Sequence, residues 1–292
     1  MFVQVVRLGG FSAAARQLGS SAGQASKLVS ALEVRLGVRL LNRTTRAIAL
    51  TPEGEEYFAR ISTILDQIDD LDESLRISDT DPHGLLRITA PLSFGAVQLM
   101  PALAQFAGLY PGIALDVNFT DSIVSLAEHG VDVAIRIGEP RDSSLRMRKL
   151  GQMQIQFVAA PDYLAQNGTP LVPEELSGHD IITDTNFSRP NDWQFAHGQT
   201  LTLTGRLRFS NAEACISAAL AGLGIAHVPD VISAPIVRSG RLVDVLQDHR
   251  PAPVPIHALS PPGRHMPQRL RLLIDFLQSR WGPTHDWAID SK

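Results

Sequence analysis

The chain has 292 residues, of which 26 are Lys or Arg and 30 are Asp or Glu, and 44% are hydrophobic. This composition is ordinary for a folded globular protein and excludes an intrinsically disordered chain. The single cysteine excludes an intrachain disulfide, and because we find no signal peptide and no run of 18 apolar residues, the sequence favours a cytoplasmic protein without a membrane segment.

Serine and glycine residues mark the predicted starts and ends of the first helices of the chain. Ser12 precedes three alanines and predicts a helix that Gly19 ends. Ser20 and Ser21 are both candidate caps of a second helix, which runs to about Leu36 before Gly37 ends it. Two short helices joined by a Gly-Ser turn are typical of a helix-turn-helix, whose second helix enters the major groove of DNA.

The second of these helices is amphipathic. Apolar residues recur at three- and four-residue steps and predict a buried face, made of Ala25, Leu28, Val29, Leu32 and Leu36. The opposite face carries Gln24, Lys27, Glu33 and Arg35. Small residues at the leading end allow a close approach to base edges, and a helix N-terminus can receive a phosphate. These small residues are Ala22, Gly23 and Ser26.

A basic segment follows the second helix. Arg39, Arg43 and Arg46, with Thr44 and Thr45, predict a hairpin suited to phosphate contact or to insertion in the minor groove. Residues 1–50 hold seven basic residues and one acidic residue, whereas the whole chain has a formal charge of −4. A basic module on an acidic protein predicts local binding to double-stranded DNA rather than indiscriminate coating.

These motifs carry a resemblance to a known family. The segment resembles the DNA-binding domain of LysR-type transcriptional regulators, with its pattern F-S-x-A-A-x-x-L, S-x-x-x-x-S, L-E-x-x-L-G, L-x-R-x-x-R and L-T-x-x-G. The matching residues are Phe11, Ser12, Ala14, Ala15, Leu18, Ser21, Ser26, Leu32, Glu33, Leu36, Gly37, Leu40, Arg43, Arg46, Leu50, Thr51 and Gly54. The alternative is a helical unit that is used only for protein contacts.

The resemblance implies a winged helix-turn-helix in residues 1–54 that binds promoter DNA. The residues expected at the DNA are Ser21, Ala22, Gly23, Gln24, Ser26, Lys27, Arg43, Thr44 and Arg46. Leu28 differs from the commonest family residue and is expected to turn inward, while Gln24 is expected to alter which bases are read. Met1 leaves only about two turns for the first helix, so we expect the native chain to start upstream.

A long helix is predicted from Pro52 to about Ile77. Its first turn is acidic, which complements the positive end of the helix dipole. A nearly heptad apolar stripe runs along it, made of Phe58, Ile61, Leu65, Ile68, Leu71 and Leu75. We expect this stripe to pair with a second copy of the chain, and packing on its own chain is the alternative. The resemblance implies a homodimer through this linker, which spans residues 55–84 with its hinge, and further assembly into a homotetramer.

Residues 85–292 alternate between strands and helices, which predicts an α/β fold with largely parallel sheets. Strands are predicted at 85–90, 113–119, 131–135, 155–159 and 225–228. Helices are predicted at 96–110, 122–129, 212–221 and 267–281, and others begin at Pro161, Pro173 and Asp230. The resemblance implies a periplasmic-binding-protein-like effector domain of two α/β subdomains joined by two crossing strands. The first would cover about 85–160 and 265–292, and the second about 161–264.

Ligands of such folds lie between the subdomains, where strands end and helices begin. Ser93 opens a helix, and by resemblance it contacts a small organic effector; the alternative is that it only caps its helix. Asn211 is a second capping position at the same site. Arg136 is expected either to offset a carboxylate or to form a structural ion pair, and His227 and Pro229 are expected to line the mouth. A carboxylate or a polar aromatic molecule would suit these residues.

Motifs of catalysis are missing from the sequence, including G-x-S-x-G, G-x-G-x-x-G, H-E-x-x-H and the Walker loop. The nine histidines are scattered, so we expect no metal and no cofactor. Cys215 is expected to be a core residue, and a redox-sensing thiol is the alternative. The sequence thus predicts an effector-controlled transcription factor rather than an enzyme. The competing hypothesis is a small-molecule binding protein or an enzyme with a helical N-terminal extension.

Overall fold

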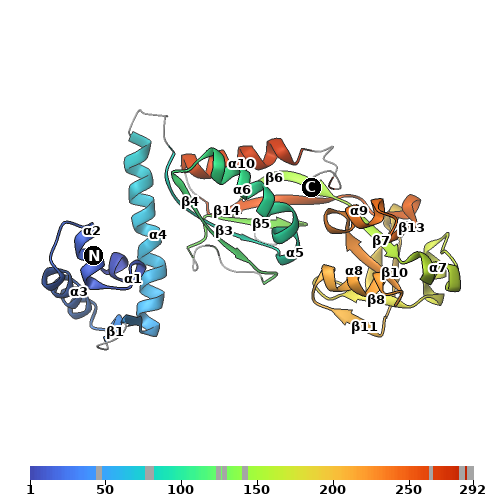
Figure 1. The fold of residues 1–292 in the computed structure, drawn as a ribbon, viewed down its shortest axis with the longest axis horizontal. Helices are drawn as coiled ribbons and strands as arrows, with labels where there is room; N and C mark the ends of the chain where they lie inside the picture. Colours follow the sequence, from blue (N-terminus) through green and yellow to red (C-terminus); the bar gives the residue numbers. More distant parts are fainter. Residues whose placement is uncertain are drawn as a thin grey trace. The chain divides into compact units, whose positions relative to one another are not determined.

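The computed structural model describes residues 1–43, 48–75, 82–122, 126, 130–139, 144–262, 266–282 and 287. The chain divides into two compact units, which Figure 1 draws as ribbons. The first unit comprises residues 1–79 and 124–130, and the second comprises residues 80–123 and 131–292. We describe each unit by itself.

The first unit is a helix-turn-helix with a wing and a long helix. It contains α1 (Phe2–Arg7), α2 (Phe11–Gln17), α3 (Ala22–Leu36), the antiparallel strands β1 (Leu41–Arg43) and β2 (Ile48–Leu50), and α4 (Pro52–Leu75). The predicted succession of two helices and a hairpin is confirmed. One cap was predicted wrongly, because Gly10 is the N-cap of α2 and Ser12 lies inside that helix.

The core of the first unit forms between its short helices and the hairpin. Its buried residues are Phe2, Val3, Val5, Ala14, Val29, Leu40 and Leu41. Glu33 was expected on the solvent face of α3, but its Oε1 accepts hydrogen bonds from the amides of Leu40 (2.9 Å) and Leu41 (3.1 Å). This side chain therefore connects α3 to the start of the wing. Gly54 is required at its position because a Cβ there would collide with the carbonyl oxygen of Leu40.

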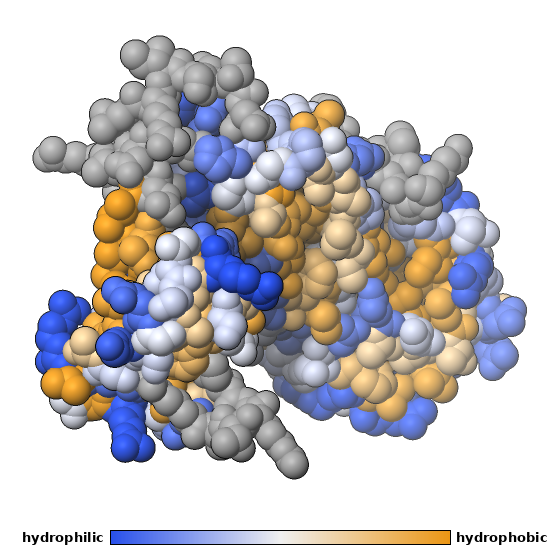
Figure 2. All heavy atoms as spheres, turned by 60° about the vertical axis from the view of Figure 1, so that its left-hand side comes forward, coloured by the Kyte–Doolittle hydropathy of each residue, from blue (hydrophilic) through white to orange (hydrophobic). Residues whose placement is uncertain are grey.

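The apolar stripe of α4 is divided between two environments. Phe58 and Ile61 pack against the core of their own chain, and the ring of Phe58 lies 6.3 Å from that of Phe2. Further along, Ile64, Leu65 and Ile68 are 49%, 40% and 50% exposed. The strip of hydrophobic atoms at the left of Figure 2 lies along this helix. The alternative of packing on its own chain thus holds for Phe58 and Ile61 but not for Ile64, Leu65 and Ile68. The side chains of Leu71 and Leu75 lie outside the described residues.

The first sheet of the second unit has the strand order β4-β3-β5-β14-β6. Its strands are β3 (Gly84–Ala90), β4 (Ile113–Phe119), β5 (Val133–Ile137), β6 (Arg146–Met153) and β14 (Val254–Ser260). A continuous helical segment follows β3, made of α5 (Leu92–Phe94), the π-helical turn Gly95–Leu99 and α6 (Met100–Leu109). Figure 1 shows α6 and the final helix α10 (Gln268–Arg280) side by side over this sheet.

The second sheet has the strand order β11-β8-β12-β7-β13. Its strands are β7 (Ile155–Ala159), β8 (Ile181–Asp184), β11 (Leu207–Phe209), β12 (Ile225–Pro229) and β13 (Val243–Val245). A separate antiparallel ribbon consists of β9 (Asp192–Gln194) and β10 (Thr200–Thr202). The helices are α7 (Pro161–Asn167), α8 (Ala212–Leu220) and α9 (Asp230–Arg238), with 3-10 turns at Pro173–Gly178, Ala196–Gly198 and Gln247–His249.

The sheets differ from the sequence-based expectation in three ways. They combine parallel and antiparallel pairs, since β14 runs antiparallel to β5 and β6, and β7 runs antiparallel to β12 and β13. The strand predicted at 131–135 lies at Val133–Ile137. Strand β7 belongs to the second sheet and β14 to the first, so the subdomain boundaries move toward Gln154 and Val254. The helix predicted at 122–129 falls mostly outside the described residues.

One described helical segment has the length and mean hydropathy of a membrane span, although it is not an unbroken apolar run. Residues Leu92–Leu109 are long and apolar enough to cross a membrane. However, Leu99, Leu103 and Phe106 are fully buried in the core of the second unit. A core helix has this pattern, because its apolar face is covered by the protein itself.

Candidate nucleic-acid interface and effector site

Helix α3 is fixed at both ends and along one face. The Oγ of Ser21 accepts a hydrogen bond from the backbone amide of Gln24 at 3.2 Å, so Ser21 is the N-cap of the two predicted candidates, Ser20 and Ser21. Gly37 ends the helix in the left-handed conformation with φ 73°. Ala25 and Val29 are buried against the core of the unit. The helix is therefore anchored through Ala25 and Val29, and its opposite face carries exposed residues.

The predicted DNA-contacting residues of α3 share that other face and its leading end. Ser21, Ala22, Gly23, Gln24 and Lys27 are exposed, and Ser26 is half-buried. The expectation that Leu28 turns inward is wrong, because this side chain is 47% exposed. It follows Gln24 by four residues and buried Ala25 by three, so it lies on the exposed side of the helix beside the buried strip.

The wing is described only in part. Arg43 is the last residue of β1, where it pairs with Ile48 of β2. The side chain of Arg43 and the whole of Thr44 and Arg46 lie outside the described residues. The predicted role of these three residues at the DNA backbone therefore stays a prediction.

Two of the predicted effector residues contact each other across the two subdomains. Asn211 Nδ2 donates a hydrogen bond to Ser93 Oγ at 3.0 Å, although 118 positions separate the residues. The Oδ1 of Asn211 accepts from the amide of Ala214 at 3.1 Å, so this residue caps α8 as predicted. Ser93 does not cap its helix, because Pro91 is the N-cap of α5. The alternative role for Ser93 is thereby excluded.

A second contact between the subdomains was missed by the sequence analysis. Asp121 follows β4, and its Oδ1 accepts from the amide of Leu92 at 3.0 Å. Its Oδ2 accepts from Nδ2 of Asn186, which follows β8, at 3.1 Å. A signal existed, because both residues are polar and come just after a strand, at the edge where ligands of such folds lie.

Arg136 lies within β5 rather than after a strand. Its guanidinium donates to the carbonyl oxygen of Ile135 at 2.9 Å and lies 3.4 Å from both Thr89 Oγ1 and the carbonyl oxygen of Ser122. Burial lowers the pKa of Arg136, and the negative charge of Asp121 acts in the opposite direction. The cation is thus held near Asp121, at the end of the strands where Ser93 also lies.

The expectation that His227 and Pro229 line the mouth of the site needs correction. His227 lies inside β12, and its ring is 4.4 Å from that of Phe187 and 4.9 Å from that of Trp193. Burial lowers the pKa of His227 to about 3, so its ring is neutral. Pro229 is buried, and its carbonyl oxygen lies 2.9 Å from Ser233 Oγ. Both residues therefore pack the second subdomain.

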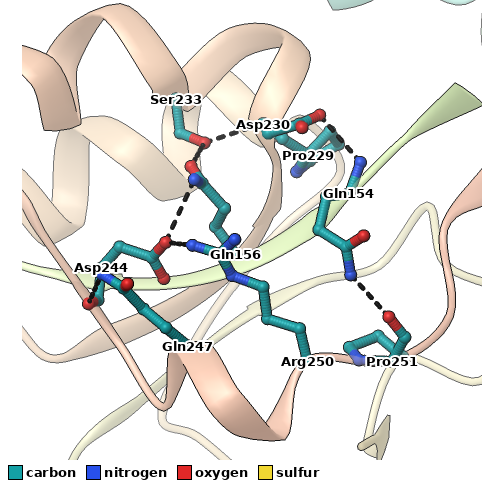
Figure 3. A network of polar contacts seen from close by, with 9 residues as sticks. All are labelled: Gln154, Gln156, Pro229, Asp230, Ser233, Asp244, Gln247, Arg250 and Pro251. Atoms are coloured by element: carbon teal, nitrogen blue, oxygen red, sulfur yellow. Dashed lines mark hydrogen bonds and ion pairs between the residues drawn. The ribbon is translucent and has the colours of Figure 1, made fainter. Parts of the chain in front are cut away.

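A polar network surrounds the segments that connect the two sheets (Figure 3). Gln154 lies between β6 and β7, and its backbone N–H donates a hydrogen bond to the carboxylate of Asp230. Its carbonyl oxygen accepts one from the backbone N–H of Asp230. Its side chain donates to the carbonyl oxygen of Pro251, on the other connecting segment, at 2.5 Å. Deeper in the second subdomain, Asp244 forms an ion pair with Arg250. Asp244 also accepts a hydrogen bond from the side-chain amide of Gln156 at 3.1 Å.

Cys215 is a core residue of α8, as predicted. The side chain is fully buried, and burial together with the charge of Asp184 raises the pKa of its thiol to about 12. At pH 8 only about one thiol in ten thousand would then be ionised, and the thiolate is the reactive form. We expect a maleimide reagent to leave the native protein unlabelled at pH 8 and to label it after denaturation. Rapid labelling of the native protein, followed by mass spectrometry, would contradict this expectation.

Among the described residues, no three His, Cys, Asp or Glu side chains are grouped so that they could hold a metal ion.

Comparisons with known proteins cover both units. The family model of the bacterial regulatory helix-turn-helix protein, LysR family, matches residues 1–55, and that of the LysR substrate binding domain matches residues 79–282. The transcriptional regulator CrgA of Neisseria meningitidis serogroup C is 35% identical over 285 residues, which are 97% of this chain and 95% of that protein.

Solved structures agree with these matches. The structure of CrgA from Neisseria meningitidis, a LysR-type transcriptional regulator, has a TM-score of 0.64 at 34% identity and covers 96% of this chain and 97% of that one. The full-length structure of the Vibrio cholerae virulence activator AphB has a TM-score of 0.61 at 31% identity and covers 95% of this chain and 96% of that one. The likeness therefore extends over nearly the whole length of all three chains.

Proposed function

The chain belongs to the LysR family of transcriptional regulators, and we propose that α3 enters the major groove of promoter DNA while a small organic effector binds between the two subdomains. The first unit is the DNA-binding domain of the family, and the second is its effector-binding domain. We further propose that the protein acts in the cytoplasm and has no enzymatic activity.

One observation carries the proposed DNA contact. The Ser21-capped α3 buries Ala25 and Val29, which leaves Gln24 and Lys27 on the exposed side of the helix. This face combines an amide, a cation and small residues, which are the groups that reach base edges and phosphates. Arg43, Thr44 and Arg46 would contact the DNA backbone from the wing, in a module that is basic overall.

We expect the Lys27→Ala variant to bind promoter DNA roughly tenfold more weakly than the unaltered protein. The reason is the loss of one cation from the face of α3. A gel shift with DNA from upstream of the protein's own gene, repeated at rising salt, measures the effect, and the salt slope should become shallower.

The matched control is Lys149→Ala, which removes an exposed lysine from the effector-binding domain. It should bind DNA like the unaltered protein. No preference of the unaltered protein for this DNA over random duplex would favour the competing hypothesis, a binding protein or enzyme with a helical extension.

We propose that α4 holds two copies of the chain together and that dimers assemble further into tetramers. The support is the exposed apolar row of Ile64, Leu65 and Ile68, whose exposure in water is unfavourable unless a partner covers it. A dimer would place two copies of α3 on two half-sites of a roughly symmetric promoter sequence.

The proposed effector site is centred on Ser93, Asn211 and Arg136. The support is the hydrogen bond between Ser93 and Asn211, two residues that belong to different subdomains. A bound ligand would replace this hydrogen bond with contacts of its own. Arg136 would offset a negative group of the effector, and a carboxylate or a polar aromatic molecule fits these groups. The effector must bind one arrangement of the subdomains better than the other in order to change DNA binding.

We expect Ser93→Ala to weaken the response to the effector. A screen of metabolites by thermal shift on the full chain would find a ligand that raises the melting temperature, because binding stabilises the folded state. The shift at a fixed ligand concentration should shrink in Ser93→Ala. It should persist in Ser217→Ala, whose exposed hydroxyl bonds only to the carbonyl oxygen of Glu213 in its own helix. Equal shifts in both variants would refute the site.

A further inference from the structure

Leu28 is an exposed leucine on the face of α3 that the proposed function turns toward DNA. Its side chain is 47% exposed, although the helix offers a core on its other side. Gln24 and Ala31, which neighbour Leu28 at helical spacings of four and three residues, are also exposed, and so is Lys27, which precedes Leu28 in the sequence. Leu28 therefore lies where the exposed polar face of α3 meets the buried strip, because Leu32, four residues further on, packs against the core of the unit.

The charge of this surface restricts what can cover Leu28. Lys27 is adjacent to it, and residues 1–50 contain seven basic residues and one acidic residue. That acid, Glu33, is turned to the amides of Leu40 and Leu41 and does not oppose an anion on this face. A partner with dense negative charge, many hydrogen-bonding edges and occasional apolar groups is complementary to such a surface, and the DNA major groove has these properties.

The apolar group of the major groove is the C5-methyl of thymine. We propose that Leu28 packs against the methyl group of one thymine in each half-site and so specifies a T·A pair there. This inference rests on the proposed function of α3. Gln24, one turn earlier on the same side of the helix, carries the amide that pairs bidentately with adenine, so the two residues would favour neighbouring A·T pairs.

The test removes the methyl group from the DNA. A binding site is first selected with the full-length chain from a random duplex library. Each thymine is then replaced by deoxyuridine at symmetric positions in both half-sites, which preserves base pairing and deletes only the methyl group. For the unaltered protein, we expect one symmetric position at which the Kd rises about three- to fivefold for each methyl lost. For Leu28→Ala and Leu28→Asn, the same replacement should leave the Kd unchanged.

Leu18→Ala is the matched control, because Leu18 is also a leucine with 47% exposure in the same unit. This variant should keep the full sensitivity to deoxyuridine. The proposal is overturned if deoxyuridine costs the same in the unaltered protein and in both Leu28 variants at every position, or if it costs nothing anywhere. Failure of the unaltered protein to select any sequence would instead refute the proposed function.

Discussion

Leu65→Glu is expected to convert the proposed dimer to a monomer and to reduce the affinity for promoter DNA by a factor of about a hundred or more. Leu65 lies between Ile64 and Ile68 in the exposed apolar row of α4. A glutamate there would place two like charges in the dimer contact, where each loses its hydration without a partner. The loss of DNA affinity follows because a monomer engages one half-site, whereas a dimer engages two.

Analytical ultracentrifugation at micromolar concentration and a gel shift measure these two effects. The matched control is Leu171→Glu, the same substitution at a leucine that is 74% exposed in the effector-binding domain. That variant should remain dimeric and bind DNA normally. Circular dichroism should show that the Leu65→Glu monomer is folded, because Phe58 and Ile61 still pack on the core of their own chain. A folded Leu65→Glu protein that stays dimeric would show that another surface joins the subunits.

Asp244→Ala is expected to lower the free energy of unfolding by about 3 kcal/mol, the cost of breaking a buried ion pair from one side. The side chain of Asp244 is 1% exposed, and its removal leaves the guanidinium of Arg250 without its carboxylate. It also leaves the amide of Gln156 without its acceptor. For a domain of this size the melting temperature should fall by roughly 6 to 12 °C.

Differential scanning calorimetry of the full chain measures this shift in the transition of the effector-binding domain. Asp248→Ala is the control, because Asp248 is an exposed aspartate four residues away. It should change the melting temperature by little. The double variant Asp244→Leu with Arg250→Met should recover much of the loss, because it removes both charges and keeps the volume. If Asp244→Ala has the same melting temperature as the unaltered protein, the ion pair does not stabilise the domain.

The candidate effector site was only partly predictable. Ser93 could be proposed because it follows a predicted strand and opens a predicted helix, and Asn211 because it stands at a predicted helix start. Their mutual hydrogen bond could not be predicted, since no local spacing encodes a contact across 118 residues. Asp121 and Asn186 each carried the local signal of a polar residue just after a strand, but their mutual contact across 65 residues could not be predicted for the same reason. His227 was misplaced because its exposure depends on the rings of Phe157, Phe187 and Trp193, which come from distant segments.

The sequence by itself determined the elements whose causes are local. The cap of Ser21 acts three residues away, and Gly37 needs a conformation that other residues avoid. The helical period correctly placed Ala25 and Val29 in the core, but Leu28 and Leu36 of the predicted buried face are 47% and 37% exposed. These features, in their order along the chain, were enough to identify the family. Only the tertiary structure decided which strand pairs with which, that Glu33 connects α3 to the wing, and that Leu28 faces outward. Each of these depends on the total surface that distant elements cover, and a side chain is buried only where such an element reaches it.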